Sequence, residues 1–126
     1  MGALPSAKLR FPRSRRFQKG HEFARAKNEG QRFVSGCLIA NWVPAQTPGF
    51  TKLGVITSSR IGPAVVRSRA RRLLRESFRL NQHGIKSSHD LVLIARNSIS
   101  QKKLQEVSRD FLRAMKHAKL LNEEVQ

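Results

Sequence analysis

Residues 60–79 read Arg-Ile-Gly-Pro-Ala-Val-Val-Arg-Ser-Arg-Ala-Arg-Arg-Leu-Leu-Arg-Glu-Ser-Phe-Arg, and this stretch indicates a long amphipathic helix. It holds seven arginines and one acid, Glu76. Pro63 fits the first position of a helix, where proline is tolerated, and Gly84 fits the stop. At 100° per residue the apolar side chains gather on one side of a helix over about 63–82. The stretch therefore predicts a helix that packs on a core and carries arginines on its other faces.

Helical geometry divides these arginines into two sets. Arg67 and Arg71 fall on one flank and Arg69 on the other, so we expect these three to border a groove beside the sheet. The outward set, expected to face solvent, comprises Arg72, Arg75 and Arg79. Guanidinium groups make paired hydrogen bonds to phosphate oxygens, and like charges four residues apart destabilise an isolated helix. So many arginines with one counter-acid favour a polyanionic partner over a merely solvated face.

Composition supports the same interpretation. The 126 residues fit one domain, and 25 Lys and Arg against 8 Asp and Glu give a formal charge of +17. Nucleic acid is the leading partner, and a membrane surface is the second candidate for the charge alone. No apolar run approaches the ~20 residues that span a bilayer, and no secretory signal is expected. Residues 1–6 match the myristoylation pattern only loosely, and the single Cys37 excludes an internal disulfide. We expect a cytoplasmic protein.

The rest of the chain predicts an α+β fold, a small mixed β-sheet with helices packed over it. We expect a basic flexible arm over 1–16, a single α+β domain over 17–121 that binds nucleic acid, and a frayed tail over 122–126. Around the arginine helix, the order αββαβα places a helix at 17–29, a hairpin of strands at 31–43 and 51–57, a strand at 90–95 and a helix at 101–121.

The arginine stretch also resembles the signature of the bacterial ribonuclease P protein subunit. Gly54-Val-Ile-Thr-Ser58 and the gap-free run from Ile61 to Glu76 carry the resemblance. It extends to Glu22-Phe23 and to His89–Arg96, and it covers roughly residues 9–121. The resemblance implies a protein that binds the catalytic ribonuclease P RNA and precursor tRNA, while the RNA removes the 5′ leader with Mg²⁺. It implies no catalytic side chain and no stable protein partner.

Fold details and site residues follow from the resemblance as well. It implies a left-handed β-α-β crossover, against the general rule, and a leader cleft between the first helix and the sheet. The residues expected to bind RNA are Arg60, Arg67, Ser68, Arg69, Arg71, Arg72, Arg75, Phe23, Lys27 and Asn41.

Three of these positions depart from the family pattern. Ser68 replaces an asparagine, so a metal-linked role at this position is in question. Lys27 replaces a second cleft aromatic, and Asn41 replaces a frequent tyrosine, while Trp42 is expected to point to the other face. We therefore expect leader binding to rely more on phosphate contacts and to be unusually sensitive to salt.

Two other classes of function share some of these features. A structural RNA-binding protein, such as a small ribosomal protein, shares the charge and the α+β composition and stays an alternative. A protein nuclease is disfavoured because Asp90 and Asp110 are isolated carboxylates and the four histidines show no metal-ligand spacing. Phe33 and Trp42 are interpreted as core residues rather than platforms for bases.

Overall fold

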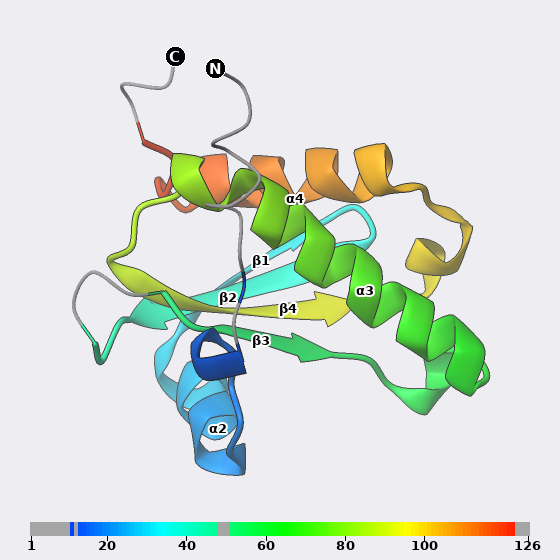
Figure 1. The fold of residues 1–126 in the computed structure, drawn as a ribbon, viewed down its shortest axis with the longest axis horizontal. Coiled ribbons are helices and arrows are strands. Elements are labelled where there is room, and N and C mark those ends of the chain that lie inside the picture. Colours follow the sequence, from blue (N-terminus) through cyan, green and yellow to red (C-terminus); the bar gives the residue numbers. More distant parts are fainter. Residues whose placement is uncertain (1–10, 12, 48–50, 123–126) are drawn as a thin grey trace.

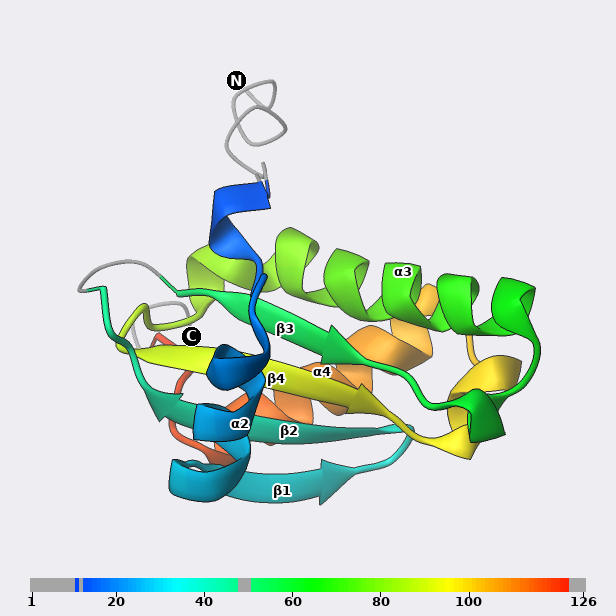
Figure 2. The same ribbon diagram turned by 90° about the horizontal axis from the view of Figure 1, so that it is seen from below.

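The computed structural model describes residues 11, 13–47 and 51–122. A four-stranded mixed sheet is covered by α3 and α4 on one face and by the short α2 on the other (Figures 1 and 2). The helices and strands are α2 (Gly20–Glu29), β1 (Gln31–Ser35), β2 (Leu38–Pro44), β3 (Leu53–Ile56), α3 (Ala64–Asn81), β4 (His89–Ala95) and α4 (Leu104–His117). Four 3-10 turns complete them: η1 (Arg13–Arg15), η2 (Ser59–Ile61), η3 (Gln82–Gly84) and η4 (Asn97–Gln101). Across the described ranges, no helix has the length and apolar character needed to cross a bilayer.

The strand order β1-β2-β4-β3 confirms the mixed sheet but corrects its predicted connections. Residues 31–43 do not form one strand: β1 and β2 pair as an antiparallel hairpin that turns at Gly36, where φ is 55°. The expected hairpin of 31–43 with 51–57 is wrong, because β3 pairs in parallel with β4. The order is therefore αβββαβα. The turn was hidden because residues 31–43 are rich in apolar and β-prone side chains and only Ser35-Gly36 marks the break.

The connection from β3 through α3 to β4 is a left-handed crossover. Both strands run left to right in Figure 1 with β4 above β3, and α3 lies in front of the sheet. In Figure 2, seen from below, α2 lies in front of the sheet, and α3 lies on the side of the sheet opposite α2. The expected handedness is thus confirmed, although most β-α-β units have the opposite one.

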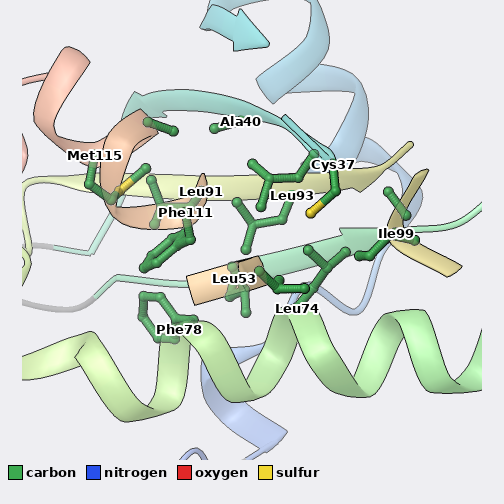
Figure 3. Close-up of a cluster of buried hydrophobic side chains, with 14 of the residues drawn as sticks. Cys37, Ala40, Leu53, Leu74, Phe78, Leu91, Leu93, Ile99, Phe111 and Met115 are labelled. Atoms are coloured by element: carbon green, nitrogen blue, oxygen red, sulfur yellow. The ribbon is translucent and has the colours of Figure 1, made fainter. Parts of the chain in front are cut away.

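The main core lies between the sheet and the two long helices. Side chains alternate along each strand, so Leu91 and Leu93 of β4 point to this face and meet Leu74 and Phe78 of α3 (Figure 3). Phe111 of α4 closes the cluster and is fully buried. Phe78 thus lies in the core, whereas Leu80 of the same helix is 42% exposed.

The opposite face of the sheet has a much smaller apolar cluster. It consists of Ala26, Val43 and Val92, with Phe23 and Ile94 packed at its border. Because α2 has only ten residues, it covers one end of this face. Side chains of β2, β3 and β4 beside α2 are left to line a groove.

Chain segments outside the predicted domain boundaries also pack on the domain. Phe11 is buried with its ring centroid 5.4 Å from that of Phe78, and Arg16 forms a parallel bridge with Leu53 of β3. The arm expected over 1–16 therefore includes packed residues, while 1–10 and 12 lie outside the described part. At the other end, Asn122 N donates to Gly84 O at 2.8 Å, and 123–126 lie outside the described residues.

Candidate RNA interface

The three expected cleft residues come together in a groove between α2 and the sheet. Phe23 and Lys27 lie one turn apart on α2, and Asn41 faces them from β2. The groove has a volume of about 280 Å³, and Arg32, Ile56, Val92 and Ile94 are among its other lining residues. Lys27 and Arg32 are both exposed, so the groove combines an apolar floor with a cationic rim. Such a surface suits a single-stranded polyanion with apolar bases.

Asn41 contributes a polar group to this groove. The residue is 6% exposed, and its Oδ1 atom is buried without a hydrogen-bond partner in the described structure. An amide buried in this way gains from a hydrogen bond that a ligand or water supplies. The neighbouring Trp42 is buried in the main core near His117, on the other face, as expected.

Close packing fixes the ring of Phe23. Phe17 meets it edge to face, with centroids 5.0 Å apart. Both rings lie over Gly54 of β3: a Cβ atom there would be 2.6 Å from Cε1 of Phe23 and 2.7 Å from Cδ2 of Phe17. Only glycine leaves room for this approach, so Gly54 helps to hold the aromatic wall of the groove.

A second pocket, which shares Phe23 with the groove, lies beside β3. It has a volume of about 390 Å³, and its other lining residues include Arg16, Phe17, Val55 and Arg75. Burial lowers the pKa of Arg75, and the positive charges of Arg16 and Arg71 lower it further. Cations held near one another in a partly apolar pocket attract an anion.

The position of Arg75 corrects an expectation. Helical geometry alone predicted that it faces solvent, but the chain around Arg16 and Phe17 runs along β3 and covers that side of α3. Sequence reasoning also missed Arg16 and Phe17, which it assigned to the arm and to the first helix. The run Arg15-Arg16-Phe17 was a weak signal, because arginine next to an aromatic is typical of nucleotide-binding surfaces.

The remaining arginines of α3 are held in different ways. Arg71 donates to Thr57 Oγ1 at 2.8 Å and to Ser68 Oγ at 3.2 Å. Arg69 donates to the carbonyl oxygens of Lys102 at 2.7 Å and Ser100 at 3.4 Å, and so ties α3 to η4.

Of the other three, Arg79 forms an ion pair with Glu76, and Arg72 and Arg67 differ in burial. Arg72 is exposed, whereas Nε of Arg67 is buried without a hydrogen-bond partner. The expected flank set is therefore partly engaged within the fold, whereas Arg72, which belongs to the expected outward set, offers its guanidinium to solvent.

The isolated carboxylates have structural roles. Asp90 accepts a hydrogen bond from Lys52 N at 2.9 Å, and Asp110 accepts one from Cys37 N at 2.9 Å. Within 11, 13–47 and 51–122, no group of three or more His, Cys, Asp or Glu side chains is placed to hold a metal ion.

Comparison with known proteins agrees with this geometry. The family model for ribonuclease P matches residues 11–119. The chain is 35% identical over 115 residues to the ribonuclease P protein component of Clostridium beijerinckii, covering 86% of this chain and 92% of the relative. It is 31% identical over 107 residues to that of Alkaliphilus metalliredigens, covering 85% and 96%.

Solved structures show the same fold. The RNase P protein of Staphylococcus aureus superposes with a TM-score of 0.77 at 23% identity, covering 86% of this chain and 98% of that one. The RNase P protein of Thermotoga maritima gives a TM-score of 0.73 at 23% identity, covering 81% and 96%.

The α+β sandwich with its left-handed crossover and arginine helix defines a class of RNA-binding subunits of ribonucleoprotein enzymes. Within that class, the chain belongs to the ribonuclease P protein family, the protein subunits of endoribonucleases that act in tRNA processing. Its partner is the ribonuclease P RNA, and RNA-based catalysis is consistent with the structural roles of Asp90 and Asp110. The alternative of a small ribosomal protein is not favoured, because the relatives are ribonuclease P proteins.

Proposed function

We propose that the groove between α2 and the sheet binds the single-stranded 5′ leader of precursor tRNA in the cytoplasm. The observation that carries this proposal is the convergence of Phe23, Lys27 and Asn41 on one groove. The Phe23 ring offers a face on which a base can stack, a contact that is largely indifferent to base identity. Lys27 attracts backbone phosphates, and the Asn41 amide offers a hydrogen bond to a base edge or a sugar.

The second part of the proposal assigns the exposed arginines of α3 to the RNA subunit. Arg72 and its neighbours form a cationic face that reduces repulsion between the RNA subunit and the precursor. Mg²⁺ ions bound by RNA phosphates would supply the chemistry, while this chain positions the leader and adds positive charge. Ser68 is exposed and engaged by Arg71, which supports a role in holding that guanidinium rather than a metal.

Reconstitution with a bacterial ribonuclease P RNA at low Mg²⁺ tests this function. We expect the wild-type chain to stimulate cleavage of precursor tRNA. Phe23→Ala should weaken binding of a precursor with a long leader by roughly fivefold to hundredfold, the range of one stacked base. Binding of a substrate with a one-nucleotide leader should not change.

Lys27→Ala and Lys116→Ala provide a matched pair, since both lysines are exposed but Lys116 lies on α4, away from the groove. Only Lys27→Ala should weaken binding of the long leader. Equal losses with long and short leaders would contradict the assignment of the groove, and no stimulation by the wild type would contradict the function itself.

A further inference from the structure

A third pocket lies at one end of the sheet, away from the leader groove. The parallel neighbours β3 and β4 end at Ile56 and Ala95, so their carboxyl ends meet at the same edge. The turns η2 and η4 follow these two ends and pack against each other. In Figure 1 they lie at the right of the molecule, beside the start of α3, whereas α2 lies at the lower left. Crevices outside the carboxyl ends of parallel strands are frequent ligand sites.

The residues of this pocket are all polar, and two of them are cationic. Its volume is about 530 Å³, and the lining residues are Ser58, Arg60, Arg96, Asn97 and Ser98. Ser58 and Arg60 come from the chain after β3, and the other three from the chain after β4. No carboxylate lines the pocket.

Local contacts shape this pocket without neutralising it. Ser58 Oγ accepts a hydrogen bond from Arg60 N at 3.2 Å, which fixes the turn that carries the Arg60 side chain. Arg96 Nη1 donates to Gly36 O at 2.9 Å, which anchors that guanidinium by one of its nitrogens. Among the ion pairs of the described residues, none involves Arg60 or Arg96.

These features select the chemistry of a ligand. Two guanidinium groups without a counter-acid exclude a cation and favour an anion with several acceptor oxygens. The serine hydroxyls and the Asn97 amide add donors suited to the same oxygens. A phosphodiester fits this set of groups, whereas a base or an apolar side chain finds no apolar wall in the lining.

We propose that Arg60 and Arg96 form a phosphate-binding site occupied by a backbone phosphate of the ribonuclease P RNA. The choice of RNA rests on the proposed function, in which the leader occupies the groove at the other end of the sheet. The position of the pocket supports the RNA subunit as the molecule that supplies the phosphate. Arg69 ties α3 to the carbonyl groups of Ser100 and Lys102, so the pocket adjoins the arginine face of α3, which is assigned to the RNA subunit. Arg60 therefore acts together with Arg96 rather than with the helix arginines alone.

Three variants and a control test this site. Arg60→Gln, Arg96→Gln and the double variant remove the guanidinium groups, and Arg109→Gln removes an arginine on α4 that is exposed as well. Affinities for the RNA subunit and for a single-stranded leader oligonucleotide are measured between 50 and 200 mM salt. Each pocket substitution should lower the slope of log K against log salt by about 0.7–0.9 with the RNA subunit. Between 50 and 200 mM salt, the affinity of the wild type for the RNA subunit should therefore fall by roughly threefold more than the affinity of a single variant. Affinity for the leader oligonucleotide should stay unchanged.

Other outcomes overturn the proposal in distinguishable ways. A loss of leader affinity with an unchanged RNA-subunit slope would assign the phosphate to the leader. Slopes equal to that of Arg109→Gln would exclude a phosphate contact. Arg60 makes no side-chain hydrogen bond in the described structure, so Arg60→Gln stays informative if Arg96→Gln impairs folding.

A direct probe separates this site from the proposed function. Inorganic phosphate titrated into the ¹⁵N-labelled free chain should shift the side-chain Nε–Hε signals of Arg60 and Arg96 more than that of Arg109. If the wild type fails to bind the RNA subunit but these signals shift, the proposed function fails and the anion site stands. If they do not shift more than the Arg109 signal, the site itself is wrong.

Discussion

The rings of Phe17 and Phe23 meet edge to face, 5.0 Å between centroids, and both contact the space that a side chain at residue 54 would fill. Phe23 borders both the α2 groove and the Arg16–Arg75 pocket. The Phe23 ring therefore lies between the groove and the Arg16–Arg75 pocket, and its position depends on Gly54 in β3.

Gly54→Ala should displace both rings. The new Cβ would lie under 3 Å from each ring, so we expect a loss of about 1–3 kcal/mol in the free energy of unfolding and weaker leader binding. Gly20→Ala is the control, because a Cβ there meets nothing within 4 Å. Urea unfolding and leader titrations measure both effects, and equal behaviour of the two variants would contradict this account.

Glu22 should make stability depend on acid pH. Burial would raise its pKa, but hydrogen bonds from Lys52 Nζ and from the amides of Gln18 and Lys19 outweigh burial and lower the pKa to about 2. Because the folded pKa lies below the unfolded value of 4.5, this contribution is full above about pH 4.5 and is lost as pH falls towards 2.

Urea unfolding of the wild type and of Glu22→Gln from pH 6 to pH 2.5 measures the contribution of this carboxylate. At pH 6 the free energy of unfolding of the wild type should exceed that of the variant by at most about 3 kcal/mol. This difference should become smaller as the pH falls. Glu29→Gln, which removes a carboxylate with a 65% exposed side chain, should show little such trend. A difference that stays constant with pH would argue against the role of Glu22.

The Cys37 thiol should be inert in the folded protein. Its side chain is fully buried, and burial together with the neighbouring Asp110 carboxylate raises its pKa to about 12. At pH 8 only about one molecule in ten thousand would carry a thiolate, the reactive form. Labelling with a thiol-specific disulfide reagent should therefore proceed at the rate of unfolding, and rapid native labelling would show that the turn at Gly36 opens locally.

Arg69 and Arg72 should respond differently to substitution by alanine. Arg69 donates to two carbonyl oxygens next to η4, so Arg69→Ala should cost about 1 kcal/mol of unfolding free energy. Arg72 is exposed, and Arg72→Ala should leave stability unchanged while weakening binding to the RNA subunit. Thermal melts and binding titrations on both variants separate the two roles. Identical melting temperatures would show that the Arg69 bonds contribute nothing to stability.

Lys27→Phe should change how leader binding depends on salt. Replacing one phosphate contact by a stacked ring should reduce the salt slope by about 0.7 and leave or raise affinity at high salt. Leader titrations from 50 to 400 mM salt measure this. The same slope in both proteins would mean that Lys27 does not contact a phosphate.

The groove was expected from the family resemblance, and local spacing explains why its residues meet, whereas the sheet connections were expected wrongly. Phe23 and Lys27 are four residues apart, so any helix over 20–29 brings them to one face, and alternation along β2 fixes the face of Asn41. The parallel pairing of β3 with β4 was not predictable in this way. It depends on the crossover through α3, which no local pattern encodes.

The pocket residues Arg16 and Arg96 illustrate the same limit. Each becomes part of a site only because a distant segment lies beside it: Arg75 beside Arg16, and Arg60 beside Arg96. Helical projection places residues on the faces of one element, but it cannot indicate which face another segment covers. For that reason Arg75 was expected in solvent and lies half-buried.

The packing of α4 on β1 and β2 has a consequence for biosynthesis. Phe111 and Met115, near the end of the domain, fill the same core as Leu38 and Leu91. A ribosome must therefore release the chain beyond Met115 before the apolar face of the first hairpin can be covered. Until then a highly basic nascent chain exposes its core face, and we expect early association with RNA to compete with completion of the fold.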